Sequence, residues 1–142
     1  MNLMQFMIPK SGTAYLYTDS TLRNGLEKMA FHGYRAIPVI NKRGKYSGTV
    51  TEGDFLRSLI STAEREPQDI RDTEKVLIKD IINVDFNPPV RVDVSLEELF
   101  TRVTEQNFVP VTDDRGMFIG IVTRRNVMRY LCDIWKGNAN LQ

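Results

Sequence analysis

The stretch AIPVINKRGKYSGTVTEGDFLRSL, residues 36–59, is repeated later in the chain as FVPVTDDRGMFIGIVTRRNVMRYL, residues 108–131. Proline, glycine and threonine positions shared by the two copies lie 72 residues apart, and Asp54 corresponds to Asn126 at the same offset. Upstream, the segment at 20–29 is similar to that at 94–103 at an offset of 74. A repeat of this length indicates a structural unit that is built twice.

Signals for strands and helices alternate in the same order within each copy. β-branched runs alternate with stretches whose apolar residues recur at helical spacing, and Gly44 lies in a hairpin connection between two such runs. In the first copy the predicted strands are 14–18, 36–40 and 46–51. One predicted helix follows a cap at Ser20 and Thr21, and the other begins at Glu52. The sequence therefore predicts strand, helix, strand, strand, helix, occurring twice.

The predicted fold class is α/β, with two βαββα repeats packed about a pseudo-twofold axis into one module. A unit of roughly 50 residues has too small a core to be stable alone, so the repeats are expected to cover each other's apolar faces. The expected boundaries are a first repeat at 1–62, a linker at 63–76, a second repeat at 77–136 and a C-terminal tail at 137–142. The linker is assigned because that stretch is polar, charged and interrupted by Pro67.

Composition and charge exclude several classes of function. The 142 residues include 19 Lys and Arg against 18 Asp and Glu, and a net charge of +1 does not favour general binding to nucleic acid or membranes. No apolar run approaches the roughly 20 residues of a membrane span, and the first ten residues lack the basic region of a signal peptide. A single cysteine, Cys132, cannot form an internal disulfide, which favours a cytoplasmic protein. Its side chain is expected to be a small buried hydrophobe.

Catalysis and metal binding are also not expected. One histidine, His32, and one cysteine are too few for a zinc site of the usual kind. The sequence shows no nucleophile paired with His32, so we expect no catalytic residues, no metal and no catalytic cofactor.

The two strand-to-helix junctions differ in charge. TEGD at 51–54 carries a formal charge of −2, and TRRN at 123–126 carries +2. A hydroxyl and the free N–H groups of a first helical turn form an anion site, and Arg124 and Arg125 would add charge-assisted contacts to phosphates. The alternative is that these arginines are a solvated surface pair and that the two threonines serve only as N-caps.

The motif that closes each repeat resembles the signature of the cystathionine-β-synthase (CBS) domain, and the chain resembles a tandem pair, or Bateman module. The pattern G-x-x-[ST]-x-x-D is matched fully by Gly48, Thr51 and Asp54. In the second copy it is matched with one departure, because Asn126 replaces the aspartate. Both glycines could instead serve close strand-to-helix packing.

The resemblance implies adenine nucleotides bound in two clefts between the repeats. In each cleft, the signature of one repeat would face the first strand and the strand before the signature of the other. The first site would contain Ala14, Arg35, Ala36, Ile37, Thr123, Arg124, Arg125 and Asn126. The second cleft would contain Pro89, Asn107, Phe108, Thr51, Glu52 and Asp54. Small alanines would leave room for a base, and Asn126 would be a weaker acceptor for ribose hydroxyls than Asp54.

Among CBS pairs, the chain is most similar to the small stand-alone bacterial proteins that bind cyclic di-AMP. The shared features are FMI near the start, GYxAIPV in the first repeat and G-I-x-T-R-R in the second. This implies a regulatory homodimer that binds cyclic di-AMP and modulates a partner protein or enzyme. The alternatives are a sensor of AMP, ADP, ATP or S-adenosylmethionine that uses the Asp54 cleft, and a structural dimerisation module with empty clefts.

Overall fold

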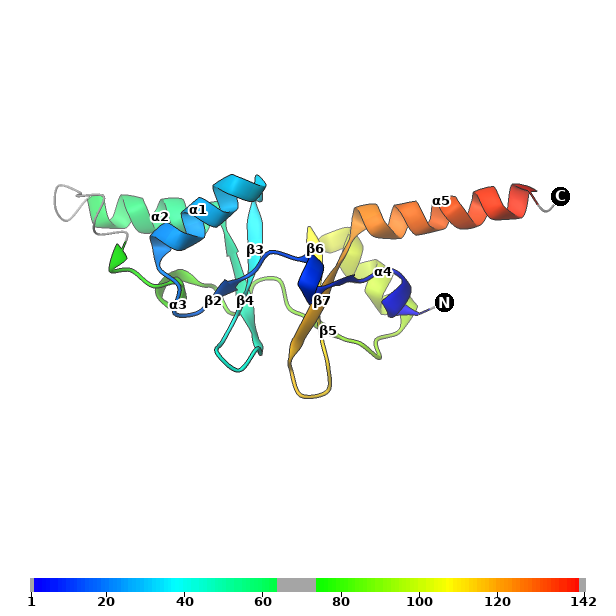
Figure 1. Ribbon diagram of the computed structural model, residues 1–142, viewed down its shortest axis with the longest axis horizontal. Helices are drawn as coiled ribbons and strands as arrows, with labels where there is room; N and C mark the ends of the chain where they lie inside the picture. The colour runs from blue at the N-terminus through cyan, green and yellow to red at the C-terminus, as the bar shows by residue number, and fades with distance from the viewer. Residues whose placement is uncertain (1, 64–73, 141–142) are drawn as a thin grey trace. The chain divides into compact units, whose positions relative to one another are not determined.

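The computed structural model describes residues 2–63 and 74–140 (Figure 1), so most of the predicted linker lies outside the described residues. The strands are β1 (Ile8–Pro9), β2 (Leu16–Tyr17), β3 (Ala36–Ile40), β4 (Tyr46–Thr51), β5 (Val90–Arg91), β6 (Phe108–Thr112) and β7 (Phe118–Thr123). The helices are α1 (Leu22–His32), α2 (Glu52–Ala63), α3 (Ile78–Ile81), α4 (Leu96–Glu105) and α5 (Arg124–Asn140), with 3-10 turns η1 (Leu3–Gln5) and η2 (Lys10–Gly12).

The predicted α/β class and the order of elements within each repeat are confirmed. The first repeat forms β2, α1, β3, β4 and α2, and the second forms β5, α4, β6, β7 and α5. In both, the first strand is parallel to the second and the second is antiparallel to the third. Both hairpins shift register at equivalent places, Val39/Ile40 and Val111/Thr112, so the repetition in sequence is also a repetition in geometry.

The chain divides into two compact units. Unit 1 contains Met1–Thr13 and Asn87–Gln142, and unit 2 contains Ala14–Phe86. The N-terminal segment therefore belongs with the strands of the second repeat, and the segment before Asn87 belongs with those of the first. The pseudo-twofold packing of the repeats and their exact boundaries in the sequence stay predictions.

Unit 1 is built around a four-stranded sheet in the order β1-β7-β6-β5. Its core contains Leu3 and Phe6 from the N-terminal segment together with valines and a leucine from β5, α4, β6, β7 and α5. The Phe6 ring meets Phe100 and Tyr130 edge to face, at centroid distances of 5.7 and 4.8 Å. The N-terminal segment is thus part of the core of unit 1.

Gly120 allows the N-terminal segment to lie against β7. β1 pairs antiparallel with β7 through Ile8 with Ile121 and Pro9 with Gly120. A Cβ at position 120 would lie 2.3 Å from the carbonyl oxygen of Ile8, a separation no side chain can occupy. Gly120 therefore allows two strands to approach each other closely. The alternative considered from the sequence was close packing of a strand against a helix, which is not what this glycine permits.

In unit 2, the segment around α3 packs against the repeat as the N-terminal segment does in unit 1. Ile78 is fully buried in the core beside Phe55, and Asn83 forms an antiparallel bridge with Thr49 of β4. Gly48 has a φ of 144°, and a Cβ there would lie 2.9 Å from Cδ1 of Ile82. In each unit, a segment outside the repeated strands and helices therefore pairs with the third strand of the repeat.

The ends of α1 have the residues expected of helix caps, whereas the burial expected for Cys132 is not observed. Thr21 caps α1 by accepting the N–H of Asn24 at 3.1 Å, and Gly33, with a φ of 67°, ends the same helix. The expected burial of Cys132 is wrong, because its side chain is exposed on α5. Helix α5 continues beyond the rest of unit 1 (Figure 1).

We expect the stability of the fold to depend on pH above 10 because of Tyr46. Burial raises the pKa of Tyr46 to about 12, partly offset by its hydrogen bond of 2.7 Å with Oγ1 of Thr49. Since the folded state favours the neutral phenol, the stabilisation is complete below the ordinary pKa of about 10 and is lost as the pH rises toward 12.

This stabilisation amounts to about 2 to 3 kcal/mol, and Tyr46→Phe should remove the corresponding pH dependence. Urea unfolding at several pH values between 9 and 12 measures it. Tyr17→Phe is the matched control because Tyr17 is 42% exposed. An equal flattening of the pH profile in the two variants would contradict the assignment to Tyr46.

Candidate functional site

The signature residues at the start of α2 cap the helix reciprocally. Oγ1 of Thr51 accepts the N–H of Asp54 at 3.2 Å, and Oδ2 of Asp54 accepts the N–H of Thr51 at 2.9 Å. Oδ1 of Asp54 is held by Nη2 of Arg57 at 2.6 Å. This is a capping box, and its carboxylate also complements the positive end of the helix. The motif thus has a complete structural role in unit 2.

The start of α5 has the same threonine cap but a different use of the fourth residue. Oγ1 of Thr123 accepts the N–H of Asn126 at 3.2 Å. Nδ2 of Asn126 donates to the carbonyl oxygen of Phe6 at 3.3 Å. A carboxylate at this position has no donor for that carbonyl. The departure from the family signature therefore coincides with a contact to the N-terminal segment.

Arg124 and Arg125 are in different environments. Nε of Arg124 donates to the carbonyl of Val103 at 2.7 Å, and its Nη2 donates to that of Thr104 at 3.1 Å. Arg124 therefore satisfies free carbonyls in the last turn of α4, where a cation also complements the helix dipole. The hypothesis of a merely solvated arginine pair is wrong for Arg124.

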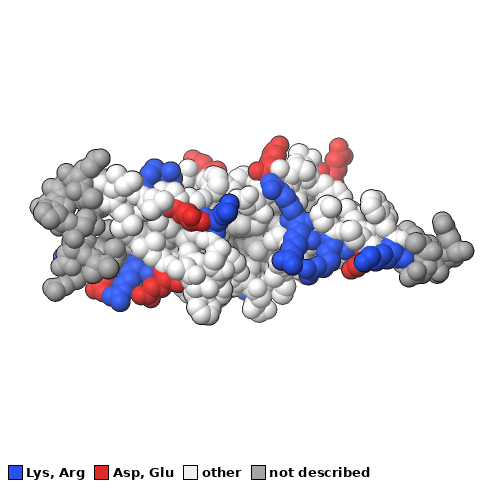
Figure 2. All heavy atoms as spheres, turned by 90° about the horizontal axis from the view of Figure 1, so that it is seen from above, with Lys and Arg blue, Asp and Glu red and all other residues white. Residues whose placement is uncertain are grey.

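Arg125 is exposed and makes no hydrogen bond or ion pair with any residue that the structure describes. It follows the capping threonine by two positions, on the first turn of a long helix. Basic side chains gather on the surface over the region where α5 begins (Figure 2). The cation available to an anion at this helix start is therefore Arg125.

The remaining predicted residues of unit 2 lie beside the signature of the same unit. Ala36 is the register partner of Thr51, and the carbonyl of Arg35 accepts the N–H of Glu52 at 3.0 Å. Ala14 and Ile37 are buried in the core of unit 2. Both position 14 and position 36 carry the small side chain of alanine.

In unit 1, Phe108 is the register partner of Thr123, and Pro89 and Asn107 are exposed. The structure thus brings the pre-signature residues of each repeat next to the signature of the same repeat. Each of the two predicted sites takes residues from both units, so their assembly stays a prediction.

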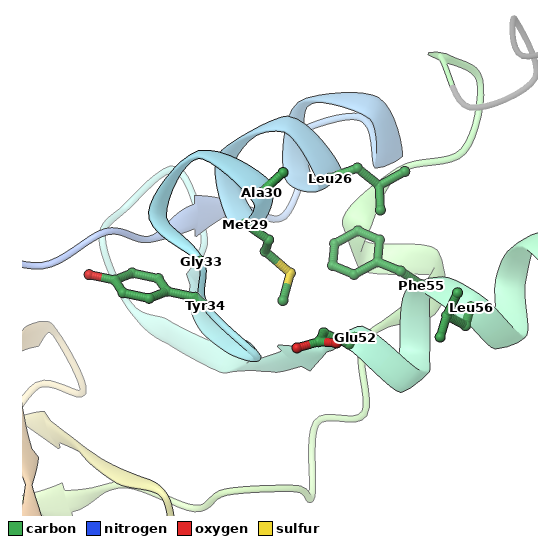
Figure 3. A pocket seen from close by; sticks show the side chains of 8 residues that line it. All are labelled: Leu26, Met29, Ala30, Gly33, Tyr34, Glu52, Phe55 and Leu56. Atoms are coloured by element: carbon green, nitrogen blue, oxygen red, sulfur yellow. The ribbon is translucent and has the colours of Figure 1, made fainter.

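A pocket that the sequence did not predict lies between α1 and α2 in unit 2. Its volume is about 370 Å³. Figure 3 shows Met29 reaching down from α1 toward Glu52, with the Phe55 ring between the two helices. The lining residues are Leu26, Met29, Ala30, Gly33, Tyr34, Glu52, Phe55 and Leu56. Helical spacing in the sequence does not show where two helices diverge, so it gives no signal for this pocket.

Two other kinds of site are absent from the described residues. Within residues 2–63 and 74–140, His, Cys, Asp and Glu side chains form no group of three that could hold a metal ion. In the same ranges, every helix is too short or too polar to cross a membrane.

Comparison with known proteins identifies the family. The model of the CBS domain matches residues 7–61 and 76–133. The chain belongs to the CBS-domain family and contains two copies of the domain. The two matched ranges contain the two sequence copies from which the fold was predicted.

Individual relatives agree with this assignment. Cyclic di-AMP receptor B of Bacillus subtilis (strain 168) is 30% identical over 129 residues, which cover 89% of this chain and 84% of the relative. The CbpB protein of Listeria monocytogenes, solved with c-di-AMP, is 25% identical with a TM-score of 0.74, over 99% of this chain and 98% of that one. Another CbpB complex with c-di-AMP has a TM-score of 0.88 at 20% identity, over 100% and 91%, and supports the fold alone. The predicted resemblance to a CBS pair of this group is confirmed.

Proposed function

We propose that this protein is a non-catalytic, cytoplasmic regulator that binds an adenine nucleotide, cyclic di-AMP in particular, and thereby modulates a partner protein. The observation that carries the proposal is the exposed cation Arg125 at the start of α5, which is next to a threonine cap and has no partner among the described residues. The Bacillus and Listeria relatives, whose names and complexes refer to cyclic di-AMP, support the choice of ligand. The two phosphates of that ligand are anions, which the free N–H groups of a first helical turn and an arginine side chain favour.

In the proposed site, Thr123 and Arg125 bind a phosphate, and the backbone around Ala14, Ala36 and Ile37 accommodates a base. Arg35 supplies a second cation. Arg124 orients the first turn of α5 through its bonds to α4 and contributes only its remaining N–H groups. The second cleft, with Pro89, Asn107, Phe108, Thr51 and Asp54, is the proposed place for AMP, ADP or ATP in the runner-up function. Its Asp54 carboxylate, released from Arg57, would accept ribose hydroxyls.

A thermal-shift panel with cyclic di-AMP, AMP, ATP and S-adenosylmethionine tests the function. A ligand that binds only the folded protein stabilises it by about 2.7 kcal/mol at a concentration 100 times its Kd. We expect cyclic di-AMP to raise the melting temperature most. If cyclic di-AMP leaves it unchanged while AMP raises it, the runner-up is correct. No shift with any nucleotide would favour the structural dimerisation module.

We expect Arg125→Ala to weaken binding of cyclic di-AMP by about 10- to 100-fold, because a hydrogen bond to a charged group contributes about 1.5 to 3 kcal/mol. Titration calorimetry at two salt concentrations measures the affinity and should show a weaker salt dependence in the variant. Arg129→Ala, on the same helix and also exposed, is the matched control. Equal affinities of Arg125→Ala and the wild type would remove Arg125 from the site.

We also propose that the protein is a homodimer. Large apolar side chains are exposed on the two helices that line the pocket, with Phe31 86% exposed, Leu56 57% and Ile60 59%. Burying such side chains against a second copy would remove apolar surface from water. Sedimentation at several protein concentrations measures the state of assembly.

A further inference from the structure

The side chain at position 126 distinguishes the two helix starts more sharply than the arginines do. In unit 2, the Asp54 carboxylate turns back to the N–H of Thr51 and forward to Arg57. In unit 1, the Asn126 amide instead donates to the carbonyl of Phe6, 120 positions away in the sequence. The rest of the cap is the same in both, since each threonine hydroxyl accepts the N–H three residues later.

The carbonyl of Phe6 lies in a segment that is attached to the rest of unit 1 by two other kinds of contact, core packing and strand pairing. Phe6 and Leu3 are each 1% exposed in the core. β1 adds to the edge of the sheet at β7, in the space left by Gly120. A capping box between Asn2 and Gln5 shapes η1 before the segment reaches the sheet. The Asn126 bond joins this segment directly to the first turn of α5.

An aspartate at position 126 would have an alternative that the asparagine lacks. The residue three positions later in unit 1 is Arg129, which corresponds by the repeat offset to Arg57, the partner of Asp54. A carboxylate at 126 could thus adopt the arrangement of Asp54, with the N–H of Thr123 and the guanidinium of Arg129 as donors. Facing the Phe6 carbonyl, the same carboxylate would bring two acceptors together without a proton between them.

We propose that Asn126 is a positioning residue that fastens the N-terminal segment Leu3–Pro9 to the start of α5, and that an amide rather than a carboxylate stands there for this reason. The bond connects the segment to the turn that carries Arg125. The segment and this helix start therefore open and close together. The proposal concerns the protein without nucleotide and is independent of the function proposed above.

Hydrogen–deuterium exchange of the nucleotide-free protein tests the proposal. We expect exchange in the peptides that cover residues 3–9 to rise by about 3- to 10-fold in Asn126→Asp and in Asn126→Ala, the factor expected from losing one hydrogen bond. In Asn126→Asp the first turn of α5 should keep its protection and the urea midpoint should not fall, because the carboxylate completes the capping box. Asn126→Ala should also show faster exchange in the segment. Alanine cannot complete the capping box, so this variant should not keep the protection of the first turn of α5 or the urea midpoint.

Asp54→Asn is the matched control, since it makes the opposite change at the equivalent position of unit 2. It should leave exchange at residues 3–9 at the wild-type level. Unchanged exchange of the segment in both Asn126 variants would overturn the proposal. A uniform rise of exchange throughout unit 1, including β6 and α4, would also overturn it, because the residue would then act on general stability and not on the segment.

Discussion

Gly120→Val is expected to detach β1 from β7 and to lower the free energy of unfolding of unit 1 by about 3 kcal/mol, at the upper end of the usual cost of overpacking. A Cβ at this position would lie 2.3 Å from the carbonyl oxygen of Ile8 and 2.8 Å from Cγ of Met7. The Met7 side chain can rotate away, but the Ile8 carbonyl is backbone and cannot. The N-terminal strand must therefore leave the sheet.

Urea unfolding followed by far-UV circular dichroism measures this loss, and hydrogen exchange at residues 3–9 locates it. Gly137→Ala is the control, because a Cβ at position 137 meets no atom within 4 Å. That variant should be unchanged or slightly stabilised, since alanine favours a helix. A Gly120→Val protein with the wild-type midpoint and a protected N-terminal segment would show that the close approach at β7 is not required.

Phe55→Ala is expected to destabilise unit 2 by about 3 to 5 kcal/mol, the range for truncating a buried phenylalanine. The side chain is 1% exposed and belongs to the core cluster that also contains Ile78. A Cβ on Gly25 would lie 2.9 Å from Cζ of Phe55, so the ring fills the space between α2 and the backbone of α1. Its removal leaves a cavity that the helices can fill only by moving.

Leu56→Ala is the matched control for this variant. Leu56 is the next residue on α2 and also lines the pocket, but it is 57% exposed. We expect a loss of well under 1 kcal/mol when both proteins are unfolded in urea at the same low concentration. Equal losses in the two variants would mean that Phe55 is not the residue that holds α1 to α2.

The repeat in the sequence determined much of the fold. Two copies at an offset of 72, each with alternating β-branched and helical periodicities, specify the order of strands and helices because those periodicities are local properties of the chain. Thr21 and the signature threonines marked helix starts correctly for the same reason: a cap involves residues only a few positions apart. The family followed from the same motifs.

The candidate site was predictable only in part. The contrast in charge between TEGD and TRRN is visible in the sequence, and it indicated an anion site at the start of α5. Spacing could not distinguish Arg124, which bonds to the carbonyls of Val103 and Thr104, from Arg125, which is unpaired among the described residues. The sequence did not predict the pocket between α1 and α2. The periodicity of apolar residues along a helix is the same whether a neighbouring helix packs against that face or diverges from it.

By itself, the sequence determined the duplicated α/β architecture, the helix caps and the CBS family, all of which are written in local patterns and their repetition. Only the tertiary structure decided that residues 1–13 join the second repeat, that Gly120 is needed by a strand from the other end of the chain, and that Asn126 bonds to Phe6. Those outcomes depend on which backbone carbonyls and apolar faces lie next to each other after the chain has folded. Such contacts join residues more than 100 positions apart, and no local periodicity encodes them.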